Sequence, residues 1–306
     1  MEKNFNQKMN KAKEKKDDEF YTRIEDIEEE LKNYKEQFKN KIVYLNCDKV
    51  NFSNFYFYFK DKFKEFDLKK VVLTSLGSNF KHEIILEDNE LKEIKTELKK
   101  DENFTDGDFK SPACLEILKE IDIVVTNPPF SLFRLFIDTM IKNNKSFLII
   151  GGMPALGNKD IFKAIYSRKL WVGYNNNSLS FFNEQKELKD VSICWYTNLK
   201  VNDKKEHLKL VNYEDKEYLK YDNFDAIEVG RLKDIPFNYN GLIGVPITIL
   251  KRINPDFEII GKYNNNVYKF EVDAIDRDYV KERFNLKGKK LFSRVLIKLK
   301  REESEK

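Results

Sequence analysis

The sequence predicts a doubly wound α/β fold, in which helices cover a mostly parallel sheet. Short apolar runs rich in β-branched residues recur along the chain, and segments of helical periodicity alternate with them. One run, Ile121–Thr126, ends at the consecutive residues Asn127-Pro128-Pro129-Phe130. Such runs are typical of strands buried on both faces, and neither proline can extend a sheet ladder. We therefore predict a buried parallel strand with a stiff corner at its carboxyl end, where open α/β sheets bind ligands.

Length and composition allow one large α/β domain with an appended module. The chain has 306 residues, of which 41% are hydrophobic and 35% are charged. A formal net charge of +4 argues neither for nor against a nucleic-acid partner. Lysines gather near both ends of the chain, and such runs serve either solubility or phosphate contacts.

Cysteine usage and the amino terminus indicate a reducing compartment. Cys47, Cys114 and Cys194 are widely spaced and form no Cys-x-x-Cys pair, so we expect no disulfide framework and no metal site. The amino terminus is charged and has no apolar segment, and no stretch has the length of a membrane span. The expected location is therefore cytoplasmic, with no membrane partner.

The first part of the chain predicts a charged leader and the first strand–helix unit. Residues 1–17 are charged and expected to be mobile. A helix follows, with one apolar face made of Ile24, Ile27, Leu31 and Tyr34. Residues 41–45 predict the first core strand, and a glycine-free loop then carries Asp48. Ser53 is expected to cap a helix whose apolar face consists of Phe55, Phe59, Phe63 and Phe66.

The next segments predict a second strand and an edge elaboration. Residues 69–76 read as the second strand, which ends in Thr74 and Ser75 where an acid often binds ribose in this fold class. Residues 80–102 predict a hairpin at the sheet's edge. Asp108 and Phe109 follow in an Asp-Gly turn, before a helix that begins at Ser111-Pro112.

After Phe130 the alternation continues and then stops. Residues 131–137 and 161–169 predict helices, and residues 145–152 and 170–174 predict strands. Residues 191–197 predict another strand, read as the last edge of the sheet. From about residue 200 the sequence becomes charged, Asn-rich and aromatic, without further alternation. We therefore expect a catalytic domain over 18–200 and a second region over 201–306 packed on it.

Several of these segments carry a family resemblance. Asn127–Phe130 resembles the (D/N/S)-P-P-(Y/F/W) motif of methyltransferases that act on amino nitrogens, most of them on adenine N6 in DNA. Asn46-Cys47-Asp48, followed by Ser-Asn-Phe, is similar to the glycine-poor first motif of the EcoRI-type adenine methylase family. Residues 221–228, 241–248 and 288–298 match segments of that family in amino-acid sequence and in their order along the chain. The resemblance runs from Asp18 to about Lys300.

The resemblance implies a Rossmann-like methyltransferase sheet with a C-terminal DNA-recognition extension. The cofactor would be S-adenosylmethionine, and the substrate a flipped-out adenine in double-stranded DNA, with a possible restriction endonuclease acting separately. The implied catalytic residues are Asn127, Pro128, Pro129 and Phe130. The implied cofactor-binding residues are Phe20, Tyr21, Thr22, Asp48, Asp108 and Phe109. The expected roles are that Asn127 and the Pro128 carbonyl accept the two amino hydrogens while Phe130 stacks on the base, without a metal.

Other interpretations stay open at this point. Asp48 can simply cap its loop, and the aromatic pair before the first helix can be a hydrophobic staple. The same chemistry can act on a protein glutamine or on an RNA adenine. The glycine-free first motif, together with the missing acid after the second strand, would also fit a catalytically silent DNA-binding protein on this fold.

Overall fold

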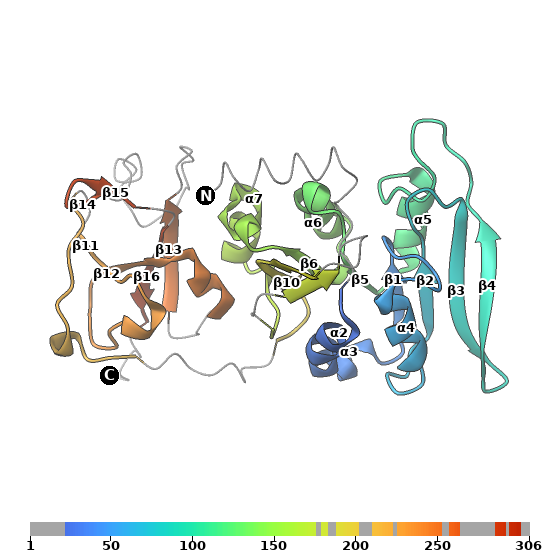
Figure 1. Cartoon of the computed structure of the whole chain (residues 1–306), viewed down its shortest axis with the longest axis horizontal. Helices are drawn as coiled ribbons and strands as arrows, with labels where there is room; N and C mark the ends of the chain where they lie inside the picture. The colour runs from blue at the N-terminus through green and yellow to red at the C-terminus, as the bar shows by residue number, and fades with distance from the viewer. Residues whose placement is uncertain are drawn as a thin grey trace, which may run out of the picture. The chain divides into compact units, whose positions relative to one another are not determined.

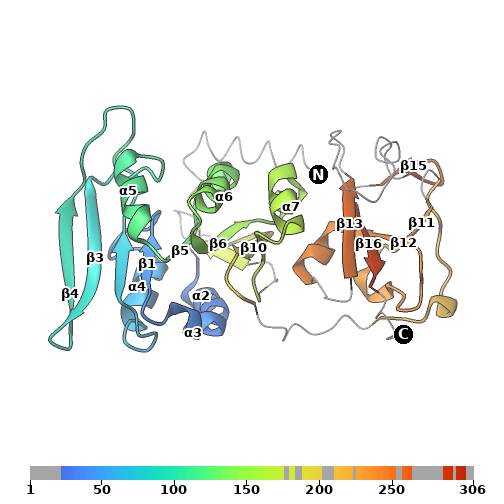
Figure 2. The same cartoon turned by 180° about the vertical axis from the view of Figure 1, so that it is seen from behind.

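The computed structural model describes residues 22–175, 179–182, 188–201, 210–222, 225–252, 257–263, 285–291 and 294–300. The expected leader over 1–17, together with Phe20 and Tyr21, lies outside these residues. The chain divides into two compact units (Figures 1 and 2). The first unit comprises residues 1–155 and 167–201, and the second comprises 156–166 and 202–306. Each unit is described by itself.

An eight-stranded sheet forms the centre of the first unit, in the order β4-β3-β2-β1-β5-β6-β10-β7. Strands β1, β2, β5 and β6 are parallel, whereas β3, β4, β10 and β7 join through antiparallel pairings. A separate antiparallel pair, β8 and β9, follows β7. The strand bounds are β1 Ile42–Leu45, β2 Lys70–Leu73, β3 Phe80–Glu87, β4 Glu90–Glu97, β5 Ile123–Thr126, β6 Ser146–Gly152, β7 Trp171–Val172, β8 Leu179–Phe182, β9 Leu188–Val191 and β10 Ile193–Thr197.

The expected strands are present, but the edge prediction for residues 191–197 was wrong. Strand β10 lies between β6 and β7, pairing Trp195 with Ile150 on one side and Tyr196 with Val172 on the other. The two-residue strand β7 is therefore the edge. The expected hairpin over 80–102 is confirmed as β3 and β4, which form the opposite edge.

Helices cover both faces of this sheet, as the alternation predicted. In Figure 1, α2, α3 and α4 lie on one side of the sheet and α5 and α6 on the other. Ser53 and Ser111 cap α4 and α5 as expected, because each hydroxyl accepts a hydrogen bond from a first-turn backbone N–H. The helix bounds are α2 Ile24–Leu31, α3 Lys35–Phe38, α4 Asn54–Asp61, α5 Pro112–Glu120 and α6 Phe133–Lys142.

Aromatic side chains fill the core beneath α4. Phe55, Phe59, Phe63 and Phe66 are all buried, although α4 ends at Asp61 and the last two rings therefore follow the helix. Of the expected apolar face, Ile27 and Leu31 on α2 and Tyr34 just after it are buried, whereas Ile24, the first residue of the helix, is 39% exposed.

A buried carboxylate joins α2 to the end of β7. Glu30 is completely buried, and its side chain accepts hydrogen bonds from the Tyr34 hydroxyl (2.7 Å) and from the backbone N–H groups of Tyr174 (2.8 Å) and Asn175 (2.6 Å). Gly173 leaves room for this carboxylate, since a Cβ at that position would overlap Glu30 Oε1. Glu30 therefore fixes where the chain leaves the sheet after β7.

The second unit contains a four-stranded sheet in the order β11-β12-β16-β13, the hairpin β14–β15 and helix α7. The side chain of Glu228 on β11 joins β16 and the segment before β11, because Arg294 on β16 donates to it at 2.8 Å and the hydroxyl of Tyr221 donates to it as well. None of the described helices is long and apolar enough to cross a membrane. The element bounds are α7 Lys159–Tyr166, β11 Ala226–Glu228, β12 Leu242–Pro246, β13 Phe257–Tyr263, β14 Asn285–Leu286, β15 Lys289–Lys290 and β16 Arg294–Leu299.

Candidate active site

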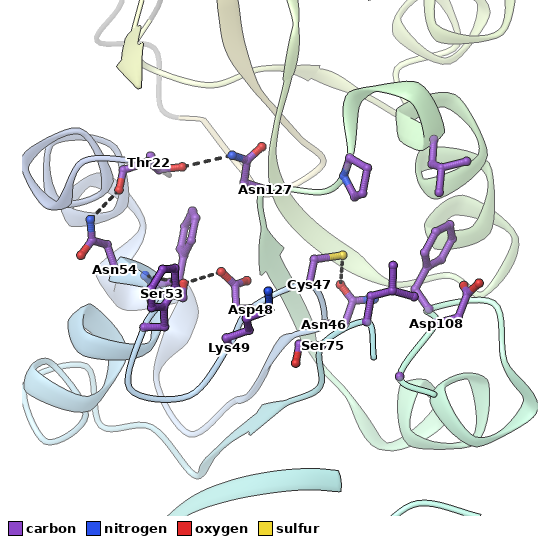
Figure 3. Close-up of a pocket in the computed structure, with 17 residues that line it drawn as sticks. Thr22, Asn46, Cys47, Asp48, Lys49, Ser53, Asn54, Ser75, Asp108 and Asn127 are labelled. Atoms are coloured by element: carbon purple, nitrogen blue, oxygen red, sulfur yellow. Dashed lines mark hydrogen bonds between the residues drawn. The ribbon is translucent and has the colours of Figure 1, made fainter. Parts of the chain in front are cut away.

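A pocket lies at the carboxyl ends of the parallel strands in the first unit (Figure 3). Its walls come from the loops after β1, β2 and β5, from the start of α4 and from the turn before α5. The empty volume is about 960 Å³, open solvent at the mouth included. The lining residues are Thr22, Asn46, Cys47, Asp48, Lys49, Phe52, Ser53, Asn54, Phe55, Ser75, Leu76, Gly107, Asp108, Phe109, Asn127, Pro129 and Leu132.

Asp48 locks the glycine-free loop after β1. One oxygen of its carboxylate accepts from the Ser53 hydroxyl, and the other accepts from the Thr126 hydroxyl at 2.8 Å. Ser53 caps α4, and Thr126 is the last residue of β5, directly before Asn127. Asp48 therefore connects three elements that meet at the pocket, and this side chain organises a loop that glycines shape in related folds.

Burial raises the pKa values of two side chains in the loop after β1. It raises the pKa of Asp48 to about 6, while the hydrogen bonds from Ser53 and Thr126 lower it. The thiol of Cys47 also lines the pocket, and burial together with the charge of Asp48 raises its pKa well above the ordinary value. The thiol is therefore held in its neutral form at neutral pH.

Asp48 gives the stability of the protein a testable pH dependence. Because its folded pKa lies above the ordinary value of 3.8, its contribution to stability is greatest below about pH 4 and declines as the pH rises through 6. The decline should amount to about 3 kcal/mol. Asp48→Asn cannot ionise, so its free energy of unfolding should rise relative to wild type by about that amount across this window. Urea denaturation at several pH values measures the difference.

A difference between Asp48→Asn and wild type that does not change with pH would contradict a raised pKa at Asp48.

Thr22 joins Asn127 to the helices beside the pocket. The side-chain amide of Asn127 donates to the Thr22 hydroxyl at 3.4 Å, and the Thr22 carbonyl accepts from the side chain of Asn54 at 2.7 Å. Thr22 precedes α2, and Asn54 is the first residue of α4. These contacts hold the Asn127 amide with its nitrogen toward Thr22 (Figure 3).

The four residues of the Asn-Pro-Pro-Phe corner have different positions. Asn127 and Pro129 line the pocket, whereas Pro128 is buried and is not among the lining residues. Phe130 begins the short 3-10 helix Phe130–Leu132, and its ring belongs to the buried core. The corner therefore presents an amide to the pocket, while the Phe130 ring points into the core.

The turn before α5 forms another wall of the pocket. Asp108 accepts from the backbone N–H of Lys110 at 2.9 Å, and its other oxygen lies 3.3 Å from the Lys110 ammonium. The ring of Phe109 packs on Phe136 with centroids 5.0 Å apart. Gly107 has φ +69°, and a Cβ there would overlap the Ser75 carbonyl oxygen, so only glycine brings this turn against the end of β2.

Most of the predicted site residues that the structure describes meet at this pocket. They are Thr22, Asp48, Asp108, Phe109, Asn127 and Pro129. Sequence reasoning did not single out Asn54, Leu76 or Cys47 as site residues. Leu76 directly follows β2, so the rule that ligands bind at carboxyl ends of strands could have found it. Asn54 had no such signal, because its link to Thr22 depends on the packing of α2 against α4.

Among the described residues, no group of three or more His, Cys, Asp and Glu side chains could hold a metal ion. The pocket's polar groups are instead amides, hydroxyls, a thiol, a lysine and two carboxylates.

Comparisons with known proteins agree on one relationship. Residues 8–300 match the family model described as "Adenine-specific methyltransferase EcoRI". The chain is 36% identical to the Type II methyltransferase M.EcoRI of Escherichia coli, over 97% of each chain. It is 36% identical to the Type II methyltransferase M.MgeORF184P of Mycoplasma genitalium, covering 94% of this chain and 98% of that protein. It is 35% identical to M.MpnI of Mycoplasma pneumoniae, covering 94% and 97%. No solved structure is significantly similar to the chain.

Proposed function

Because this chain belongs to the EcoRI family of adenine-specific methyltransferases, we propose that it methylates adenine N6 in double-stranded DNA. We further propose S-adenosylmethionine as the methyl donor and a restriction–modification system as the setting, with a cognate endonuclease acting separately. The proposal rests on the position of Asn127. This residue directly follows the buried parallel strand β5, and a hydrogen bond to Thr22 holds its side chain at the pocket.

The residues that line the pocket fit S-adenosylmethionine in their chemistry. Asp108 and Phe109 place a carboxylate and a ring on one wall, which suits an amino-bearing purine. The buried Asp48 supplies negative charge for an ammonium group, and Ser75 stands where an acid often binds ribose. Phe20 and Tyr21, which directly precede Thr22 in the sequence, remain proposed contacts to the cofactor.

Asn127 and the Pro128 carbonyl would activate the adenine amino group, which accepts the methyl group. The lone pair of an adenine amino group is delocalised into the ring, so the nitrogen is a weak nucleophile. Accepting both amino hydrogens favours a pyramidal nitrogen with an available lone pair. S-adenosylmethionine supplies an electrophilic methyl group when bound. Positioning would then account for most of the rate enhancement.

The substrate base must leave the helix to reach this corner. Flipping an adenine out of a duplex costs a few kcal/mol, which contacts to the DNA backbone offset. Phe130 would have to turn out of the core in order to stack on the flipped base. The flipped base would also have to reach the Pro128 carbonyl, because Pro128 is not among the residues that line the pocket.

Gly107 provides a test of the cofactor wall. Gly107→Ala should push the Asp108–Phe109 turn away from Ser75 and weaken S-adenosylmethionine binding about tenfold or more. The reason is that Asp108 and Phe109, the two proposed contacts to the adenine of the cofactor, both move. Isothermal calorimetry measures this affinity. Gly77→Ala is the matched control, because Gly77 also has positive φ but a Cβ there would meet open space. Equal affinities of Gly107→Ala and wild type would contradict the assigned wall.

Modification-sensitive sequencing tests the proposed function as a whole. DNA from cells that express the chain should carry N6-methyladenine within one recurring sequence, and DNA from cells that express Asn127→Ala should lack it. Unmodified DNA in both cells would contradict the proposal.

A further inference from the structure

The hairpin β14–β15 in the second unit places one lysine in its two-residue turn and another directly after the turn. Asn285 pairs with Lys290 and Leu286 with Lys289, which leaves a two-residue loop of Lys287 and Gly288. Both loop residues have positive φ, 51° and 72°. Positive φ at both central positions is the mark of a type I′ turn, whose twist matches that of the strands.

Lysine is not the residue that this turn favours. The first position of a type I′ loop prefers Asn, Asp or Gly, which tolerate positive φ. The hairpin β3–β4 follows this preference, with Asp88 and Asn89 at φ 51° and 63°. Local backbone preference therefore does not account for Lys287. A residue that breaks a local rule is expected where its side chain serves a function.

Several contacts hold the hairpin firmly in the second unit. The Asp222 carboxylate accepts from the backbone N–H groups of both loop residues, at 3.2 Å for Lys287 and 2.9 Å for Gly288. The backbone N–H of Asp222 donates to the Asn285 carbonyl at 2.8 Å. Leu286 packs on the core cluster that contains Tyr221. The direction of the loop is thus fixed by its anchors.

Among the described residues, none competes with an outside anion for the two lysine side chains. Lys287 and Lys289 are exposed, and neither forms an ion pair with any residue in the described part of the chain. Lys92 on the other hairpin, by contrast, pairs with Glu87. The Asp222 carboxylate is occupied by the loop's backbone amides.

We propose that the β14–β15 hairpin is a preformed contact to the phosphates of double-stranded DNA, made through Lys287 and Lys289. This inference rests on the proposed function, which makes DNA the substrate. A rigid two-stranded ribbon can lie against a DNA groove, and lysine ammonium groups bind phosphate as point charges. The contact holds the duplex through its backbone and reads no sequence.

A double variant separates this role from a structural one. Lys287→Asn creates the Asn-Gly pair that type I′ turns favour, and Lys289→Thr keeps a strand-forming residue, so the hairpin should remain folded. Binding of the full-length protein to a fluorescein-labelled duplex of mixed sequence is measured by anisotropy over a range of salt concentrations. The slope of log Kd against log salt should fall by about 2, since each phosphate contact contributes about 0.9. The thermal midpoint should stay the same or rise.

Lys92→Gln is the control, and it should leave the slope unchanged. A double variant with the wild-type slope would overturn the hairpin proposal while leaving the methyltransferase proposal intact. Failure of the wild-type protein itself to bind the duplex would instead overturn the proposed function on which this inference rests.

Discussion

Replacing Asn127 with alanine should lower the rate of methyl transfer by about 10²–10³-fold, the usual effect of deleting one preorganised polar group from a transition state. The alanine removes the side-chain acceptor that holds the adenine amino group, so the amino lone pair stays conjugated with the ring. Affinity for S-adenosylmethionine should change by less than about threefold, because the hydrogen bond from the Asn127 side chain to Thr22 at the pocket wall is long, 3.4 Å, and contributes little.

Single-turnover kinetics with labelled cofactor measure the transfer step, and calorimetry measures cofactor binding. Asn143→Ala is the control, because the exposed side chain of Asn143 donates to the Thr139 carbonyl at the end of α6 and does not line the pocket. That variant should turn over like wild type. Near wild-type turnover of Asn127→Ala would remove Asn127 from the mechanism.

Glu30→Ala should produce the largest loss of stability among the variants considered, about 3–5 kcal/mol. The substitution leaves the Tyr34 hydroxyl and the backbone N–H groups of Tyr174 and Asn175 without their buried acceptor. It also opens space beside Gly173. The end of β7 should then separate from α2, and the first unit should unfold at a lower urea concentration.

The neighbouring Glu29 provides the comparison, because it lies on the same helix and is exposed. Glu29→Ala should alter the free energy of unfolding by less than about 0.5 kcal/mol. Urea midpoints for the two variants, measured side by side, test the predicted difference in stability. Equal midpoints would contradict a buried carboxylate that holds these two elements together.

Local patterns in the sequence were sufficient to predict much of the fold. Ser53 and Ser111 capped the expected helices because capping depends only on nearby residues. The apolar run before Asn127 gave the buried central strand, β5, because burial on both faces requires such a run. The order of the last strands, by contrast, could not be predicted from local patterns. Strand β7 has only two residues, so its place beyond β10 depends on pairing rather than on local pattern.

The candidate site was predictable where its residues directly follow strands. Asp48 and Asn127 come after β1 and β5, and the carboxyl ends of parallel strands meet at one edge. The Asp48–Thr126 hydrogen bond joins residues 78 positions apart, and no local pattern encodes such a contact. The same holds for Phe130, because the Asn-Pro-Pro-Phe motif does not specify whether its ring faces the pocket or the core.

The most direct test of the account follows the methyl group itself. Purified protein is incubated with tritiated S-adenosylmethionine and a mixture of duplex DNA, RNA and protein, and the labelled fraction is then hydrolysed and separated. We expect the label to be recovered from duplex DNA as N6-methyldeoxyadenosine, and we expect Asn127→Ala to abolish most of it. Label recovered in RNA, in protein or on another DNA base would contradict it.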